Sequence, residues 1–257
     1  SRAGHGGTLD PDAAGVLPIG VGRGLALLGR IDWSPKGYVA LARVGVLTDT
    51  LDAAGETVAR SCAPWPTRAD WERTARFLTG RGVQIPPRLS SIKQGGQRAY
   101  ARARRGEGFV LPPRPIHIER LTVQACEADR FQFAVEASSG TYVRALVRDW
   151  GFMLGQAAHL TALVRTRAGP FRVADAVTLE ELAEDGVDRH LLSWRAVWDG
   201  PVAVLAEDEA ALVESGRWPT RITIPDGRPT ALVAGNRLRA LASDTGHYLR
   251  VFPGGLG

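Results

Sequence analysis

The length, composition and charge of the chain exclude several classes of protein. Its 257 residues, 44% hydrophobic and 23% charged, are typical of a globular protein with one large core, or with a core and a small second domain, and not of a disordered tail. The chain has no apolar run of about 18 residues and no secretion signal, so we expect a cytoplasmic protein without a membrane span. The two cysteines lack CxxC spacing, which argues against a disulfide framework and a zinc site. The net charge of +5 points toward a polyanionic partner.

A glycine-rich stretch, Gly4–Gly22, opens the chain and holds one carboxylate beside a histidine and a proline. Pro11 biases Asp10 away from the α region, so the pattern predicts an extended segment that ends in a turn, with the carboxylate projecting from a stiff backbone. The glycines around His5 would bring it beside Asp10 without bulk between them. The residues alone leave two interpretations open: Asp10 belongs to a functional site, or it caps a helix that begins at Pro11.

Two strands and two helices are predicted between this stretch and residue 79. Residues 16–22 indicate a short strand and residues 24–31 a short helix, while the β-formers of residues 37–47 predict a longer strand. Tyr38, near the start of that strand, is either a core tyrosine or a functional one. Residues 71–79 carry apolar side chains at helical spacing, with one face formed by Trp71, Ala75 and Leu78.

A basic segment occupies residues 86–115. Between Arg88 and Arg105 it contains six basic residues and no acidic one. A run of like charge is usually a solvated surface, but the absence of acids and the interleaved Tyr100 favour an RNA-binding surface. Because glycines interrupt the segment and prolines close it, we expect a loop.

The segment after the basic loop predicts two strands and a helix. Residues 116–125 and 131–138 form an antiparallel pair in this prediction, and the second strand alternates strictly between apolar and polar side chains. A Ser-Gly turn then leads into a helix over residues 141–154. The N-terminus of that helix presents Tyr142 and Arg144, and Arg144 alone could equally be a plain surface residue.

The C-terminal part divides into a last strand, a capped helix and a region of different composition. Residues 159–171 predict the strand, and Thr178 caps the short helix that follows. Beyond residue 200, short apolar stretches broken by glycines predict a small β-barrel with one helix over residues 207–215. We therefore expect one domain before residue 200 and a second one after it, and the second domain is either an RNA-binding module or an inert stabilising one.

Five stretches carry a resemblance to a known family. In chain order they are GHGGTLDPDAAGVLPIGVG, KGYVALARVG, SSIKQGGQRAY, SSGTYVRALVRDWG and HLTALVRTRAGPF. Together they resemble the TruB family of tRNA pseudouridine synthases. The resemblance implies an α+β fold in residues 1–199, with a mixed, largely antiparallel sheet and flanking helices, and a small PUA-like β-barrel in residues 200–257. It also implies a monomer that isomerises the T-loop uridine at position 55 of tRNA, with no cofactor and no metal.

The resemblance assigns roles to individual residues. In the family, the position of Asp10 is catalytic, that of Arg144 pairs with the aspartate, and that of Tyr38 stacks on the target base. His5 would fill the gap that the flipped base leaves, and Tyr142 would line the pocket. Further RNA contacts are expected from residues of the later motifs: Leu163, Arg165, Lys93, Arg98, Tyr100, Arg102 and Arg104.

The chain departs from the family pattern in two places. Relatives begin with a segment of some tens of residues before the aspartate loop, whereas this sequence starts only four residues before His5, so either the segment is missing from the sequence or the protein does without it. Val164 stands where many relatives carry an arginine. Two alternative functions stay open: an RNA-binding protein or tRNA chaperone without catalysis, and a guide-RNA-dependent member of the same family.

Overall fold

The computed structural model describes residues 2–94, 96–225 and 227–257, and for residues 93, 94 and 98 it describes only the backbone. The described chain forms two compact units. The large unit consists of residues 9–16 and 33–174, and the small unit of residues up to Thr8, residues 17–32 and residues 175–257. No helix within the described residues is long and apolar enough to cross a membrane.

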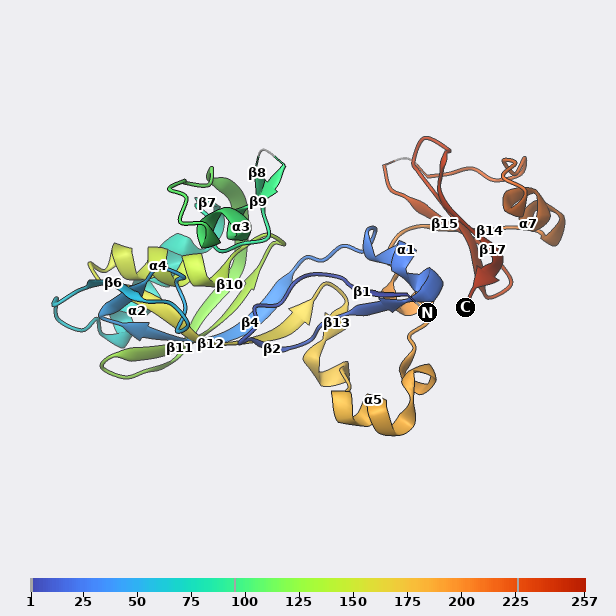
Figure 1. The fold of residues 1–257 in the computed structure, drawn as a ribbon. Helices are drawn as coiled ribbons and strands as arrows, with labels where there is room; N and C mark the ends of the chain where they lie inside the picture. Colours follow the sequence, from blue (N-terminus) through green and yellow to red (C-terminus); the bar gives the residue numbers. More distant parts are fainter. Residues whose placement is uncertain (1, 95, 226) are drawn as a thin grey trace. The chain divides into compact units, whose positions relative to one another are not determined.

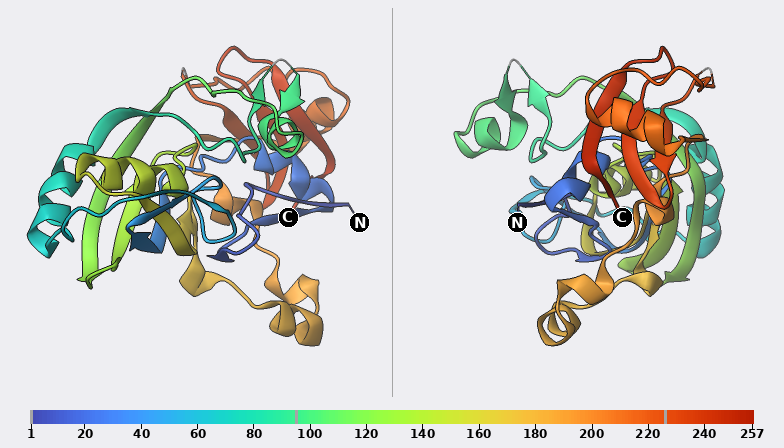
Figure 2. Two further views of the ribbon diagram at one scale, coloured as in Figure 1. Left: turned by 60° about the vertical axis from the view of Figure 1, so that its left-hand side comes forward. Right: turned by 90° about the vertical axis from the view of Figure 1, so that its right-hand side faces the viewer.

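A seven-stranded sheet organises the large unit (Figure 1). All pairs in it are antiparallel except that of β2 with β12, which is parallel. The order across the sheet is β13 (Phe171–Arg172), β12 (Ala158–Ala168), β4 (Lys36–Val44), β11 (Arg130–Ala137), β10 (Arg114–Cys126) and β7 (Gly80–Gln84), with β2 (Ala14–Gly15) beside β12. Helices α2 (Arg68–Leu78) and α4 (Val143–Met153) pack against the sheet (Figure 2).

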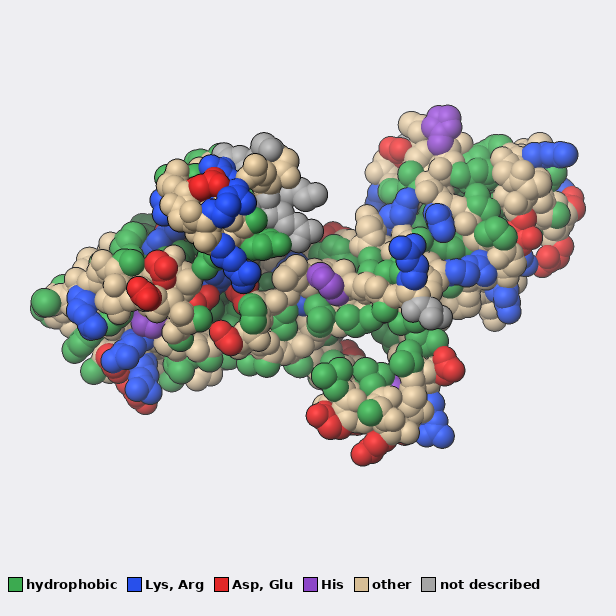
Figure 3. Space-filling view, in the orientation of Figure 1, with side chains coloured by type: hydrophobic (Ala, Val, Ile, Leu, Met, Phe, Trp, Pro, Cys, Tyr) green, Lys and Arg blue, Asp and Glu red, His purple; other side chains and the backbone are tan. Residues whose placement is uncertain are grey.

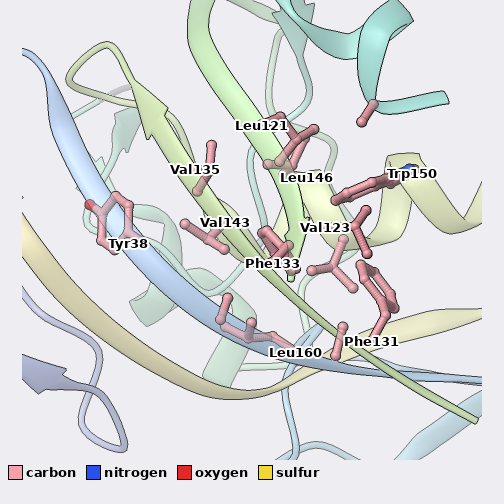
Figure 4. Close-up of a cluster of buried hydrophobic side chains, with 14 of the residues drawn as sticks. Tyr38, Leu121, Val123, Phe131, Phe133, Val135, Val143, Leu146, Trp150 and Leu160 are labelled. Carbon is pink, nitrogen blue, oxygen red and sulfur yellow. The ribbon is translucent and has the colours of Figure 1, made fainter. Parts of the chain in front are cut away.

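The core of the large unit lies where these two helices meet β11 (Figure 4). The strict alternation of β11 buries every second side chain, as the sequence predicts. Trp71 of α2 stacks on Phe131 at 4.0 Å between ring centroids, and Trp150 of α4 meets the same ring edge-on at 5.1 Å. The Trp150 indole also donates a hydrogen bond of 2.7 Å to the Thr74 hydroxyl, so its buried N–H is satisfied.

Shorter elements complete the large unit. A hairpin of β5 (Val46–Thr48) and β6 (Thr57–Arg60) follows β4. The segment expected to be a basic loop contains a hairpin of β8 (Lys93–Gln94) and β9 (Gln97–Arg98) and a helix, α3 (Ala99–Arg104). The expectation that this segment is a loop is therefore wrong where α3 and the β8–β9 hairpin form. Ala99, fully buried against Ile92, Phe109 and Leu111, gives this segment a small core of its own.

The small unit contains two sheets. One pairs β1 (Ala3–His5) with β3 (Ile19–Val21), followed by the 3-10 helix η1 (Gly22–Gly24) and by α1 (Leu25–Leu28). The other is four-stranded, and α7 (Glu207–Glu214), orange in Figure 2, packs against it. Its strands are β14 (Val202–Val204), β15 (Thr230–Ala234), β16 (Arg237–Ala242) and β17 (Tyr248–Leu256).

The first segment of the small unit is bonded to its last strand. Arg23 and Arg30 donate hydrogen bonds to the carbonyls of Pro253 and Leu249, at 2.7 and 2.9 Å. The remaining short helices are η2 (Val173–Asp175), α5 (Leu179–Asp185), η3 (Val187–His190) and α6 (Trp194–Val197). Thr178 caps α5 as predicted and forms a capping box with Glu181, and the mixed α+β class that the resemblance implies is confirmed.

Candidate active site

Asp10 begins a turn. The Ala13 amide donates to the Asp10 carbonyl at 2.9 Å, and Pro11 occupies the second position of this turn, where its fixed φ is favourable. A strand, β2, follows the turn, so the interpretation of Asp10 as a helix cap is wrong. The carboxylate is 38% exposed and remains accessible to a ligand.

A glycine fixes the Asp10 turn to the sheet. Gly15 pairs with Arg165 of β12 and has a φ of +107°, which side-chain-bearing residues rarely adopt. A Cβ atom at this position would lie 2.2 Å from the Arg165 carbonyl oxygen. The next residue, Val16, donates its amide to the same carbonyl at 2.9 Å. The close approach of β2 to β12 therefore requires glycine here.

Arg144, in the first turn of α4, forms a two-pronged ion pair with Asp10. Its Nε and Nη2 atoms lie 2.9 and 3.1 Å from the two carboxylate oxygens. The arginine side chain is only 7% exposed, so solvent screens this pair weakly on the arginine side. The pairing that the family resemblance implies between these residues is present, although 134 positions separate them.

Three further acceptors hold the same guanidinium. Nη1 donates to the Thr50 carbonyl at 3.0 Å and lies 3.4 Å from the Asp52 carboxylate, and Nη2 donates to the Leu89 carbonyl at 3.0 Å. The arginine is thus fixed even without Asp10. Sequence reasoning missed Asp52, because it lies in a turn-rich stretch outside the five motifs.

The backbone between Thr50 and Asp52 is strained. Leu51 has a φ of +64°, the one left-handed residue other than glycine among the described residues. Such a conformation costs about 1–3 kcal/mol, and here the Leu51 carbonyl accepts from the Leu160 amide at 3.0 Å, which ties the turn to β12. The strained turn presents the Thr50 carbonyl and the Asp52 carboxylate to the same guanidinium.

Tyr38, on β4, is buried. Its ring packs in the core with Val135 and Val143, and it is 9% exposed (Figure 4). Burial raises the pKa of its hydroxyl above the ordinary value. The charge of Arg165 and a hydrogen bond from Arg165 oppose this rise, whereas the negative charge of Asp10 raises the pKa further. The hydroxyl is therefore protonated at neutral pH.

Two predicted residues of β12, Leu163 and Arg165, are also buried. Leu163 is 8% exposed and belongs to the same core as Tyr38. Arg165 is 1% exposed, and its Nε donates to the Val16 carbonyl at 2.8 Å. Burial, followed by the charge of Arg165, lowers the pKa of the Lys36 ammonium group at the start of β4.

Tyr142 is the residue before α4 and is held through its backbone. The Gln84 side chain accepts from the Tyr142 amide at 2.9 Å and donates to its carbonyl at 3.2 Å. Gln84 is 3% exposed, and sequence reasoning missed this contact because an amide at a strand end has no characteristic spacing. The clamp fixes the N-terminus of α4, and with it Arg144. His5 is exposed at the end of β1 in the small unit.

The basic segment is partly neutralised. Arg102 and Arg105 both donate to Glu107, at 2.8 Å each, and these two hydrogen bonds lower the pKa of that carboxyl. Arg104 is exposed, with its guanidinium 5.8 Å from the centroid of the Tyr100 ring. Figure 3 shows basic side chains around an acidic one over α3. The side chains of Lys93 and Arg98 lie outside the described part of the structure.

No group of three or more His, Cys, Asp or Glu side chains able to hold a metal ion occurs within residues 2–94, 96–225 and 227–257.

Two family models match the chain. The model described as "TruB family pseudouridylate synthase (N terminal domain)" matches residues 1–143, and that of the "tRNA pseudouridylate synthase B C-terminal domain" matches residues 144–193. Among curated proteins, the chain is similar to tRNA pseudouridine synthase B of Arthrobacter sp. (strain FB24), with 42% identity over 95% of this chain and 81% of the relative. It is also similar to the protein of that name from Rhodococcus jostii (strain RHA1), with 41% identity over 93% of this chain and 83% of the relative.

Solved structures share the fold. The chain is similar to a chain in "Crystal Structure of a Cbf5-Nop10-Gar1 Complex", with a TM-score of 0.65 and 24% identity over 95% of this chain and 70% of that one. It is also similar to a chain in "Structure of H/ACA RNP bound to a substrate RNA containing 2'-deoxyuridine", with a TM-score of 0.63, 22% identity and coverage of 95% and 69%. At these identities the likeness shows the fold alone.

Proposed function

The chain belongs to the TruB family of pseudouridine synthases and is a tRNA pseudouridine synthase, and from this premise we propose that its target is the uridine at position 55 in the T loop. The reaction breaks the N-glycosidic bond of the uridine, turns the uracil while it stays bound, and rejoins it to the ribose through carbon. In this proposal the protein acts alone, as a monomer in the cytoplasm, and needs no guide RNA.

The ion pair between Asp10 and Arg144 is the observation that carries this proposal. A carboxylate can act as a nucleophile and then leave again, which suits a reaction that breaks and remakes one bond. The two-pronged pair with the buried guanidinium holds the carboxylate in one orientation, and the exposed part of Asp10 leaves room for a substrate atom. A plain surface role for Arg144 does not explain four acceptors around a buried guanidinium.

The target base must leave the stack of the T loop before it reaches Asp10. Flipping costs a few kcal/mol, and stacking on one aromatic side chain returns about 1–3 kcal/mol. We assign this stacking to Tyr38 and the lining of the pocket to Tyr142 and Leu163. His5 would fill the gap left in the RNA. These roles rest on the family resemblance, and the protonated hydroxyl of Tyr38 is compatible with a base-stacking role.

The RNA backbone would be held outside the pocket. We propose that Arg104 and Tyr100 contact it, because both are exposed and lie together, and that Lys93, Arg98 and Arg102 add to this surface. We further propose that residues 200–257 form a PUA-like RNA-binding domain and residues 1–199 the catalytic domain. The four-stranded sheet with one helix in the last residues supports a separate module there.

One experiment tests the proposed function against its alternatives. An unmodified tRNA transcript labelled with tritium at C5 of uracil is mixed with the protein alone, and tritium release is measured in a single turnover. Release of one equivalent per tRNA, abolished when the uridine at position 55 is replaced by cytidine, is expected. Binding without release would indicate a chaperone, and release only after a guide RNA is added would indicate a guide-dependent enzyme.

A further inference from the structure

A buried arginine links two parts of the candidate active site that are distant in sequence. Arg165 is 1% exposed and is one of the largest fully buried side chains among the described residues. A side chain this deep cannot reach a phosphate on the surface, so the RNA contact expected from the motif does not account for its position. Its charge must instead be satisfied inside the large unit.

The first link runs to the Asp10 turn. The Arg165 Nε atom donates to the Val16 carbonyl at 2.8 Å, and the Val16 amide donates to the Arg165 carbonyl at 2.9 Å. Arg165 therefore holds the chain just after β2 with both its backbone and its side chain. Because only a short stretch separates Val16 from Asp10, this contact limits how far the catalytic turn can shift.

The second link runs to Tyr38. Arg165 and Tyr38 are Cα partners on the neighbouring strands β12 and β4, so their side chains start from directly opposed positions. The guanidinium donates a hydrogen bond to the Tyr38 hydroxyl. A planar guanidinium with several donors in fixed directions can serve both acceptors at once, which an ammonium group on a flexible stem does poorly.

We propose that Arg165 is a positioning residue that fixes the Tyr38 ring relative to the Asp10 turn and makes no contact with the tRNA. One guanidinium on β12 then joins the chain just after β2 to strand β4, and the base-stacking ring and the catalytic carboxylate keep a constant separation. The inference rests on the proposed function, because its kinetic test measures pseudouridine formation.

Two substitutions and a matched control test it. Arg165→Lys keeps the charge but loses the fork of donors, and Arg165→Gln loses the charge. Arg167→Gln is the control, since Arg167 lies on the same strand and its Nε donates to the Gly169 carbonyl. We expect both Arg165 variants to reduce the single-turnover rate at saturating enzyme by about 10²-fold, the loss typical of a 1 Å misplacement, while the control stays near the parent rate.

The binding measurements separate positioning from phosphate contact. If Arg165 positions Tyr38, tRNA affinity and its salt dependence stay at parent values in both variants. If Arg165 instead contacts phosphate, Arg165→Gln flattens the slope of log affinity against log salt by about 0.7–0.9. Arg165→Lys then retains the parent rate, because lysine also binds phosphate well. That second pattern would overturn the proposal.

A double-mutant cycle and a spectroscopic measurement complete the test. Tyr38→Phe should slow the parent severalfold but change the rate of Arg165→Lys by less than about twofold, because the hydrogen bond is already lost. An equal rate reduction by Tyr38→Phe in the parent and in Arg165→Lys would contradict a link between Arg165 and Tyr38.

In protein labelled with ¹³C at the tyrosine Cζ, Arg165→Lys should shift the Tyr38 resonance without tRNA present, whereas Arg167→Gln should leave the resonance in place.

Two outcomes remain to be distinguished. If the parent protein does not release tritium, the proposed function fails, and the Cζ resonance alone decides whether Arg165 holds Tyr38. If Arg165→Lys does not fold, Gly15→Ala replaces it, since the added Cβ forces β2 away from the Arg165 carbonyl without altering Arg165. A folded Gly15→Ala protein with the parent rate would overturn the proposal.

Discussion

Asp10 carries the chemistry in the proposed function, and the structure makes its substitution interpretable. Arg144 keeps the Thr50 and Leu89 carbonyls and the Asp52 carboxylate when Asp10 changes, so no buried charge is stranded. Asp10→Asn should therefore fold and bind tRNA like the parent. Its turnover should fall by at least about 10⁴, on the order of 5 kcal/mol of barrier, because an amide is not a nucleophile here.

The measurement for Asp10→Asn is single-turnover tritium release, with filter binding and a melting temperature. Asp12→Asn, an exposed aspartate in the same turn, serves as the control and should retain the parent rate. A folded Asp10→Asn protein that releases tritium at the parent rate would remove the carboxylate from the mechanism.

Tyr38 predicts a pH dependence of stability. Its pKa is raised in the folded protein, chiefly by burial, above the value of about 10 in an unfolded chain. The folded state therefore binds this proton more tightly, and the stabilisation is complete below about pH 10 and is lost as the pH rises through the folded value. The melting temperature of Tyr38→Phe should fall less steeply than that of the parent between about pH 9 and pH 11. Parallel melting curves would show that burial of the hydroxyl has no energetic consequence.

At the scale of elements, two helices of this chain carry the same cap in different surroundings. Thr67 and Thr178 each form a capping box, with Asp70 and Glu181. Helix α2 buries Trp71 in the core, whereas α5 has no buried residue. Thr67→Ala should lower the free energy of unfolding of the large unit by about 1 kcal/mol, while Thr178→Ala should leave it unchanged. Urea unfolding followed by tryptophan fluorescence measures the difference, and equal effects would mean that the cap of α2 is not coupled to the core.

The basic segment offers a second matched pair. Arg104 is exposed beside Tyr100, whereas Arg105 donates to Glu107. Arg104→Ala should flatten the dependence of log affinity on log salt by about 0.7, the contribution of one contact to single-stranded RNA, and Arg105→Ala should change it less. Filter binding over a range of salt concentrations decides this. If neither slope changes, the segment is a solvated surface rather than an RNA contact.

The strands and helices with clear periodicity could be predicted from the sequence. Three features depend only on residues that are close in sequence, and a sequence pattern therefore predicts them: the alternation of β11, the apolar face of α2 and the cap of α5. Helix α3 could not be predicted, because its stability depends on Ala99 packing against residues from both sides of the segment.

The site shows the same division between local and tertiary information. The motifs placed Asp10 and Arg144 together, since both lie in stretches that match the family. Gln84, Leu51 and Asp52 escaped prediction because each acts through a contact made only in the folded chain. Arg165 was assigned to RNA from its motif, and only its burial indicates an internal role.

At the scale of the molecule, we expect the last residues to contribute affinity rather than chemistry. All five motif stretches precede residue 200. The parent protein should therefore convert full tRNA and an isolated T stem-loop at similar maximal rates, with weaker binding of the stem-loop. Deleting residues 200–257 should weaken binding of full tRNA and leave stem-loop conversion intact. Loss of stem-loop conversion in a truncated protein that keeps its circular dichroism would show that these residues take part in catalysis.

The contact between Val16 and Arg165 spans 149 positions, so its two partners leave the ribosome at different times during synthesis. A ribosome adds about 5–20 residues per second, so the Asp10 turn emerges roughly 7–30 seconds before the strand that anchors it. For most of that interval the nascent chain has the Asp10 carboxylate without Arg144, and over the whole of it the chain lacks the strand that anchors the turn. Under the proposed function, we therefore expect a growing chain to be inactive on tRNA until most of the large unit has been made.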